Sequence, residues 1–202
     1  MAMGAMSGDL HGSAPDNAAV ALLLIDVIND LEFEGGEVLL RHALPMATQI
    51  AALKRRAKLA GIPTIYVNDN FGRWQSNFDR LLAHCLRDGV RGQPLAEQLQ
   101  PEDDDYFVLK PKHSGFYATT LDLLLRYLQV TTVILTGLTG DICVLFTAND
   151  AYMRDLHVVV PADCVASLQP DENQHALTHM QRVLKADIRP SSALDLKALK
   201  CL

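Results

Sequence analysis

Three residues of different chemical types, Asp26, Lys110 and Cys143, could together cleave an acyl bond. Asp26 and Lys110 directly follow short apolar runs, and Cys143 lies after a third such run and a glycine-flanked turn. A cysteine attacks as its thiolate, and the pKa of a thiol falls at a helix N-terminus and beside a cation. We expect Cys143 to attack, Lys110 to supply the cation, and Asp26 to accept the thiol proton and return it to a leaving amine.

The turn that carries Cys143 is predicted to contribute backbone groups as well. Residues 138–143 contain a glycine and polar residues before a helical stretch, and such turns expose backbone N–H groups that can stabilise an oxyanion. Asp141 is of a residue type that commonly caps a helix N-terminus. We therefore expect Cys143 to lie in the first turn of a helix capped by Asp141.

Alternating strands and helices are needed to position these residues. Apolar runs rich in branched residues alternate with stretches of helical periodicity throughout the chain, which predicts an α/β fold with a mostly parallel sheet. The carboxyl ends of parallel strands share one edge, so the three residues should meet there. Strands are expected at 20–25, 64–67, 106–109, 132–135 and 158–160, with a short sixth at Ile188, and helices at 38–60, 78–85, 119–129, 141–154 and 171–185.

Composition excludes several classes of protein. The 202 residues include 18 Lys and Arg against 24 Asp and Glu, a net charge of −6, which is unsuited to a general nucleic-acid binder. The longest apolar run, Ala18–Ile25, is far shorter than the roughly 20 residues of a membrane span. Residues 1–17 hold no Lys or Arg and look like a flexible tail rather than a signal peptide, with a single domain at 18–202. A cytoplasmic location is the default expectation.

The cysteines and the acidic residues do not suggest a metal. Four cysteines in a chain of this length do not form a disulfide framework, and no Cys/His cluster has the spacing of zinc ligands. Cys85, Cys164 and Cys201 are expected to be structural or incidental. The acidic tract Glu102–Asp105 is interpreted as a solvated loop rather than a metal site. We expect neither a metal nor another cofactor.

Four sequence motifs occur in order along the chain: Ala21–Asp30, Lys110–Phe116, Thr136–Ala151 and, more weakly, Asp163–Ser167. With these motifs the chain resembles the isochorismatase-like cysteine hydrolase superfamily over roughly residues 18–192. The resemblance implies a three-layer α/β fold, a central parallel sheet of about six strands, and a catalytic triad of Asp26, Lys110 and Cys143. It favours Lys110 over Lys112, and it implies a cis peptide at Leu138–Thr139, with the amides of Thr139 and Cys143 forming the oxyanion hole.

Departures from the family pattern bear on the substrate. Nicotinamidases of this family hold a metal with an Asp-x-His pair after the second strand, whereas residues 68–74 contain no His. True isochorismatases lack the nucleophilic cysteine, so Cys143 argues against that reaction. A frequent glutamine is Ile28 here, and a common threonine in the nucleophile turn is Gly140.

Aromatic and basic residues near these motifs are candidates for substrate contacts. Arg73 could bind a carboxylate and Trp74 could form an apolar wall; the alternative is a surface loop whose Trp74 packs against a neighbouring subunit. Phe33 and Phe116 are further candidate substrate contacts, with core packing the favoured interpretation of each. His113 is interpreted as a surface residue.

The leading hypothesis is a metal-independent cysteine hydrolase that cleaves a C–N bond of a small amide, ureide or carbamoyl compound through a thioester. The alternative is a non-enzymatic or redox-sensing module on the same fold that binds a small molecule, with Cys143 as its thiol. Loss of Asp26 would separate the two, because it should abolish hydrolysis but not binding. A dinucleotide-binding reading is weaker, because no Gly-x-Gly-x-x-Gly follows the first strand. The resemblance also suggests a homodimer or homotetramer.

Overall fold

A parallel six-stranded sheet forms the centre of the molecule. The computed structural model describes residues 17–69, 77–87 and 89–200. The strand order is β3-β2-β1-β4-β5, with β6 pairing with β4, and every pairing is parallel. The predicted α/β fold is therefore confirmed. The strands are β1 (Val20–Ile25), β2 (Thr64–Asp69), β3 (Tyr106–Lys110), β4 (Thr132–Leu138), β5 (His157–Val159) and β6 (Val165–Ala166).

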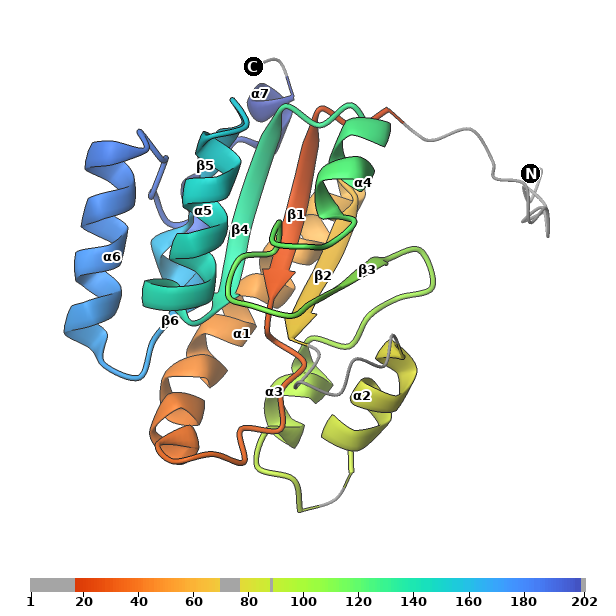
Figure 1. The fold of residues 1–202 in the computed structure, drawn as a ribbon, viewed down its shortest axis with the longest axis vertical. Helices are drawn as coiled ribbons and strands as arrows, with labels where there is room; N and C mark the ends of the chain where they lie inside the picture. Colours follow the sequence, from red (N-terminus) through yellow and green to blue (C-terminus); the bar gives the residue numbers. More distant parts are fainter. Residues whose placement is uncertain (1–16, 70–76, 88, 201–202) are drawn as a thin grey trace.

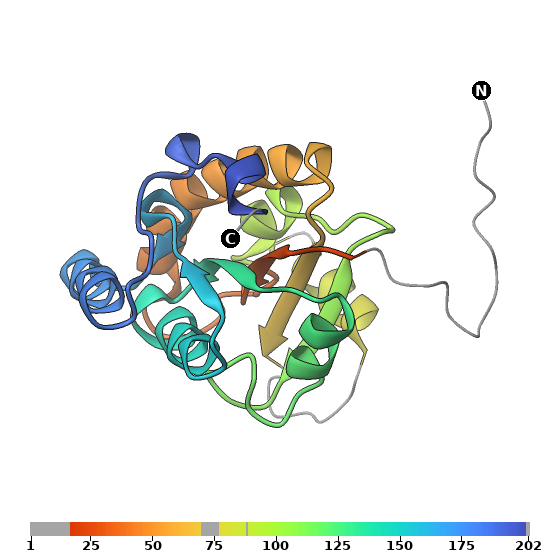
Figure 2. The same cartoon turned by 90° about the horizontal axis from the view of Figure 1, so that it is seen from above.

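Helices cover both faces of the sheet and make the three layers. Helix α1 lies on one face, and α4, α5 and α6 lie on the other (Figures 1 and 2). No helix among the described residues has the length and apolar composition to cross a membrane. The helices are α1 (Gly36–Leu59), α2 (Phe78–Cys85), α3 (Gln93–Gln98), α4 (Leu121–Tyr127), α5 (Leu145–Tyr152), α6 (Pro170–Val183) and α7 (Leu196–Leu199), with one π-helical turn, η1 (Gly140–Val144), and two 3-10 turns, η2 (Ala162–Cys164) and η3 (Ser191–Ala193).

The continuous apolar runs of the central strands follow from this layering. All six residues of β1 are buried, and they alternate between the two faces. Val20, Leu22 and Leu24 belong to the core beneath α1. Ala21, Leu23 and Ile25 belong to the core beneath α4, α5 and α6. A strand buried on both faces needs apolar residues at every position, which is why β1 was recognisable in the sequence.

The sixth strand is not where the sequence analysis placed it. Ile188 is in no strand, and its neighbour Asp187 makes an isolated bridge with Val159. The actual sixth strand, β6, pairs with the end of β4. After the bridge the chain reaches Pro190, which lacks a backbone N–H to continue a ladder, and enters η3. Of the predicted N-terminal tail, the described part of the chain includes residue 17 alone.

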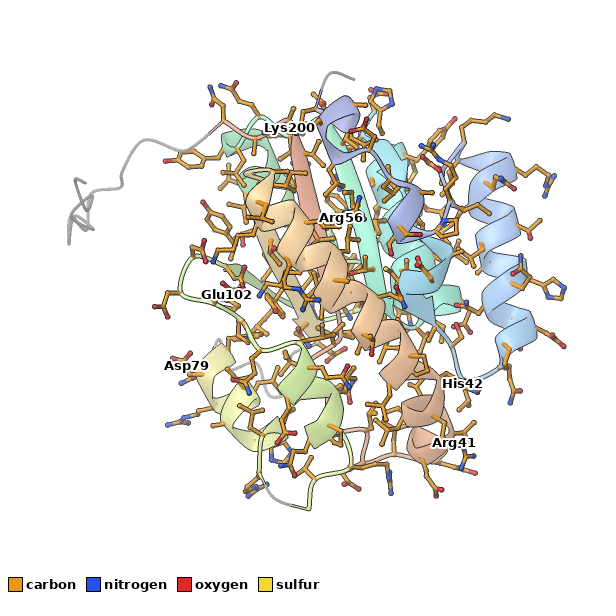
Figure 3. The ribbon with its side chains drawn as sticks, turned by 180° about the vertical axis from the view of Figure 1, so that it is seen from behind. Arg41, His42, Arg56, Asp79, Glu102 and Lys200 are labelled. Carbon is orange, nitrogen blue, oxygen red and sulfur yellow. The ribbon has the colours of Figure 1, made fainter. Side chains whose placement is uncertain are left out.

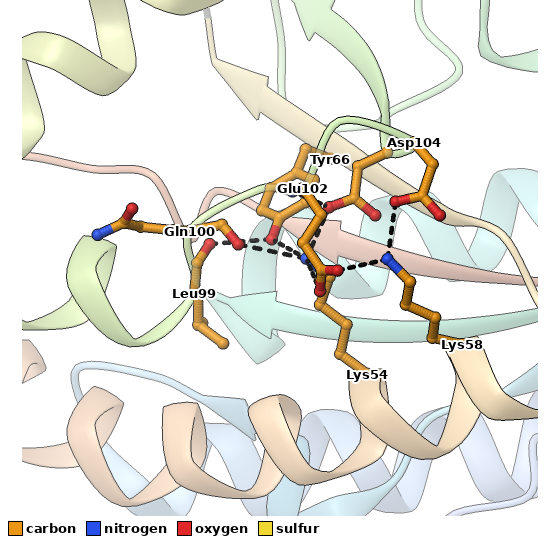
Figure 4. A network of polar contacts seen from close by, with 8 residues as sticks. Lys54, Lys58, Tyr66, Leu99, Gln100, Glu102 and Asp104 are labelled. Atoms are coloured by element: carbon orange, nitrogen blue, oxygen red, sulfur yellow. Dashed lines mark hydrogen bonds and ion pairs between the residues drawn. The ribbon is translucent and has the colours of Figure 1, made fainter. Parts of the chain in front are cut away.

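The acidic tract is an exposed loop that is anchored at its last residue. Glu102, Asp103 and Asp104 are exposed, so the expectation of a solvated loop is confirmed for them. The Asp105 side chain is only 6% exposed, and its carboxylate lies 2.6 Å from the Nζ of Lys54, a buried lysine of α1. The same Nζ donates to the Tyr66 hydroxyl at 3.1 Å, while Lys58, one turn further along α1, pairs with Glu102 and Asp104 (Figure 4).

A second contact of α1 fixes the C-terminal part of the chain. The Arg56 guanidinium donates to the carbonyls of Ser191 and Leu194 at 2.7 and 2.6 Å, which places η3 against α1 (Figure 3). Lys200 donates to the Ala60 carbonyl at 2.9 Å, just past the end of the same helix. Helix α1 thus connects the edge loop before β3 with the segment that ends the domain.

Candidate active site

Asp26, Lys110 and Cys143 meet at the carboxyl edge of the sheet. Asp26 follows β1, Lys110 is the last residue of β3 and Cys143 follows β4, and these strands are all parallel within the sheet (Figure 1). The Lys110 Nζ lies 2.8 Å from Asp26 Oδ2 and donates to Cys143 Sγ at 3.5 Å. Asp26 and Cys143 also lie close enough to shift each other's pKa. Each of the three side chains therefore interacts with the other two.

The backbone fixes Asp26 from two sides. Its N–H donates to the Val67 carbonyl at 3.0 Å, and its Oδ1 accepts from the N–H of Asp69 at 2.7 Å. Its φ of 51° is left-handed, a conformation that Asp adopts more readily than most residues. Asp69 also brings its own carboxylate to 3.8 Å from Lys110 Nζ. Asp69 was not singled out in the sequence, although it ends the second apolar strand as Asp26 follows the first.

Burial sets the protonation states of the three groups. Lys110 is fully buried. Burial lowers its pKa, but attraction from Asp26 and Cys143 outweighs that, so the pKa is raised and the ammonium stays charged. Burial raises the pKa of Asp26, against the opposing effect of Lys110, which makes its carboxylate a stronger base. The expectation of a lowered thiol pKa was wrong, because burial and the Asp26 carboxylate together outweigh Lys110 and raise the pKa of Cys143 to about 12.

The turn that carries Cys143 is one turn of π-helix, η1, followed by α5. The Thr139 carbonyl accepts from the amides of Ile142 and Val144, the two neighbours of Cys143, at 3.2 and 3.1 Å. The Leu138–Thr139 peptide is cis, as the resemblance implied. Asp141 does not cap the helix, contrary to expectation: the residue that precedes η1 is Thr139, and no side chain caps it.

A cavity of about 330 Å³ opens beside Cys143. Phe33 lines it and is 47% exposed, so the favoured interpretation of core packing is wrong for this residue. His113 is exposed, as predicted, but it also lines the cavity and its ring lies 5.4 Å from that of Phe146. The full lining is Asp26, Asn29, Phe33, Leu39, Asp69, His113, Leu138, Thr139, Ile142 and Cys143.

Phe116 does not line this cavity. It is 5% exposed and packs in the core beneath α4 and α5, with the Arg154 guanidinium 4.5 Å from its ring centre. Core packing, the favoured interpretation of this residue, is therefore confirmed. Arg73 and Trp74 lie outside the described residues.

A comparison with family models matches residues 20–188 to the isochorismatase domain. The chain belongs to the isochorismatase family. The isochorismatase family protein YaaI of Bacillus subtilis is 45% identical over 168 residues, covering 83% of this chain and 92% of YaaI. The ureidoacrylate amidohydrolase RutB of Yersinia enterocolitica is 28% identical, covering 79% of this chain and 80% of that protein. The crystal structure of N-carbamoylsarcosine amidase from Thermoplasma acidophilum has a TM-score of 0.66 at 27% identity, covering 87% of this chain and 98% of that one.

The described residues of this chain contain no set of side chains that fits the metal expected for the nicotinamidases of the family. No group of three or more His, Cys, Asp or Glu side chains there is arranged to hold a metal ion. Asp69, the carboxylate at the end of β2, faces the Lys110 ammonium.

Proposed function

We propose that this protein is a cysteine hydrolase that cleaves a C–N bond of a small amide, ureide or carbamoyl compound. The observation that carries the proposal is the mutual contact of Asp26, Lys110 and Cys143 beside a cavity. It combines a nucleophile, a base of raised pKa and a permanent cation within one hydrogen-bonded cluster, which is the set of groups that acyl transfer by a thiol requires. The names of the RutB and N-carbamoylsarcosine amidase relatives support the same class of bond.

In the first step Cys143 Sγ attacks the substrate carbonyl carbon. The S–C bond forms as the thiol proton passes to Asp26, and the carbonyl oxygen becomes an oxyanion. The backbone amides of Thr139 and Cys143 would donate to that oxygen. Because the thiol pKa is about 12, the thiolate forms mainly when the proton can move to Asp26, with Lys110 stabilising the sulfur during the transfer.

In the second step the tetrahedral intermediate collapses and the C–N bond breaks. Asp26 returns its proton to the leaving nitrogen, and the acyl group stays on Sγ as a thioester. Water then adds to the thioester carbonyl while Asp26 accepts a proton from the water. The C–S bond breaks, and that proton returns to sulfur, which restores the thiol and releases the acid.

The cavity limits the substrate to a small molecule. Its volume of about 330 Å³ lies at the lower end of ligand pockets, which span about 300–1,000 Å³. Phe33, Leu39 and Ile142 form apolar walls, while Asn29 and His113 offer polar contacts. This lining suits a compact amide with both an apolar and a polar side.

The proposal is tested by turnover and intact mass. Release of ammonia should be measured over a panel of N-carbamoyl amino acids, ureido acids and simple amides, nicotinamide included, for the wild type and for Cys143→Ala, Asp26→Asn and Cys85→Ala. Cys143→Ala should fall to background and Asp26→Asn should lose about 10²–10⁴-fold. Cys85→Ala should retain activity, because Cys85 is a buried thiol outside the cavity lining. Acid quenching should trap an acyl adduct on wild-type Cys143.

Two outcomes would overturn the proposal. Full activity in Cys143→Ala would exclude the cysteine mechanism. A wild-type protein that binds members of the panel but releases no product from any of them would favour the alternative of a binding or redox-sensing module. In that case Asp26→Asn would leave binding unchanged.

A further inference from the structure

Ser167 and Asn173 lie directly behind the turn that carries Cys143. The N–H of Asp141 donates to Ser167 Oγ at 3.2 Å, and that hydroxyl donates in turn to Asn173 Oδ1 at 3.0 Å. Ser167 follows β6 and is 2% exposed, and Asn173 lies in the first turn of α6. The Asn173 side chain also donates to the Val165 carbonyl at 3.5 Å. A two-residue relay thus connects η1 with β6 and α6.

Gly140 allows this relay to approach the turn. A Cβ at this position would lie 2.0 Å from Asn173 Oδ1, a distance that no side chain could tolerate without moving the amide. Its backbone conformation does not itself demand glycine, since its φ is not in the left-handed range. Glycine therefore leaves room for the Asn173 amide in its observed position, and any larger residue would have to displace that amide. This accounts for a glycine at a position where the family resemblance led us to expect threonine.

The relay is placed to control the oxyanion donors. Its contact at the Asp141 amide lies between Thr139 and Cys143, whose N–H groups would have to converge on one oxygen. Oxyanion donors act through being held in place before the reaction, and small displacements of such groups are costly. A hydrogen bond at the middle of the turn restricts its rotation about the two flanking donors.

We propose that Ser167 and Asn173 are positioning residues that hold the turn Thr139–Cys143 in the geometry that stabilises the oxyanion. The inference rests on the proposed hydrolase function. Neither side chain lines the cavity, so both act through the turn rather than on the substrate.

The test compares Ser167→Ala with Ser167→Thr, which keeps the hydroxyl. Ser167→Ala should lower kcat about 10- to 100-fold with KM within about twofold, the scale expected for a slight displacement of catalytic groups. Ser167→Thr should recover most of kcat. Alkylation of Cys143 by iodoacetamide should stay within about twofold of wild type in both variants, because alkylation forms no oxyanion.

Ser191→Ala is the matched control. Ser191 is 3% exposed, and its hydroxyl donates to Asp163 Oδ2 at 2.9 Å, so the variant also removes a buried serine hydrogen bond. It should lose comparable stability while keeping kcat. Unchanged kcat in Ser167→Ala would overturn the inference. So would an equal fall in kcat and alkylation, which would indicate general disorder of the site.

Two further measurements keep the inference testable if Ser167→Ala does not fold or no substrate is found. Gly140→Ala should lower kcat much less in an Asn173→Ala background than in wild type, because the amide that would clash with the new Cβ is absent there. An equal fold-loss of kcat in the two backgrounds would contradict the inference. A small aldehyde that protects Cys143 from iodoacetamide through a hemithioacetal should bind about tenfold more weakly to Asn173→Ala. Absence of all amide turnover in wild type would refute the proposed function, whereas the aldehyde still tests the relay.

Discussion

Replacing Lys110 with Met should destabilise the fold as well as abolish activity. The charges of Lys110 and Asp26 are 2.8 Å apart with side chains 0% and 8% exposed. An effective dielectric constant of about 20 gives about 6 kcal/mol of direct attraction, of which desolvation offsets much. The substitution leaves the Asp26 carboxylate buried without its cation, which should cost about 3–5 kcal/mol. For a chain of this length that corresponds to about 6–20 °C in Tm.

The pH dependence of this loss follows from Asp26. Without Lys110 its native pKa rises further above the unfolded value, so protonation relieves the penalty. The deficit of Lys110→Met should therefore grow as pH rises through that pKa, and it should be smaller at pH 5 than at pH 8. The free energy of unfolding should be measured in guanidinium at several pH values for Lys110→Met, Asp26→Asn and the double variant. Glu37→Gln, which removes one partner of the exposed Arg41–Glu37 ion pair, is the control.

The double variant supplies the refutation. With both charges gone, Asp26→Asn/Lys110→Met should recover part of the stability lost in Lys110→Met, because no unpaired charge is left from the pair. Asp26→Asn alone should cost less than Lys110→Met, since Asp69 still lies 3.8 Å from the lysine. Strictly additive losses, or a deficit in Lys110→Met that is constant with pH, would refute the picture of a buried, mutually compensating pair.

Three further outcomes are expected. In the native protein iodoacetamide should label Cys143 but not the buried Cys85 and Cys164, which peptide mapping with and without guanidinium would show. The rate of Cys143 labelling should rise about tenfold per pH unit between pH 7 and 10, because the Cys143 pKa is about 12, and a plateau of the rate near pH 8 would contradict this. Phe33→Ala should raise KM several-fold with little change in kcat, since the ring lines the cavity without contacting the triad, and steady-state kinetics would show the opposite if it acts in chemistry. Lys54→Met should lose about 3–5 kcal/mol in guanidinium unfolding by leaving Asp105 buried and unpaired, with kcat of the folded fraction unchanged.

The sheet was predictable because its strands are buried on both faces. Val20–Ile25 and Val133–Leu135 are continuous apolar runs, and the alternation with helices favours a parallel topology. The two-residue β6 was missed because pairing so short leaves no periodic signal. Ile188 looked like a strand residue, but its apolar character serves packing against the core beneath α6.

The sequence predicts those site residues that stand at the ends of strands and carry reactive groups. It predicts less well the contacts that Asp26 makes with backbone groups of a neighbouring strand. Asp26, Lys110 and Cys143 are placed together by the parallel topology itself. The contribution of Asp69 depends on its amide reaching Asp26 across the β1–β2 pairing, which is a matter of register. Phe116 packs in the core, as its apolar ring favoured, although it lies within the Lys110–Phe116 motif that begins at the site.

The protonation state of the thiol is the point at which residue types were least informative. A lysine 3.5 Å from Cys143 suggests a resting thiolate, yet the same lysine lies closer to Asp26, at 2.8 Å. The carboxylate and burial then raise the thiol pKa to about 12. The proposed mechanism therefore has to move the thiol proton to Asp26 as Sγ attacks, instead of starting from the thiolate that the residue types alone suggest.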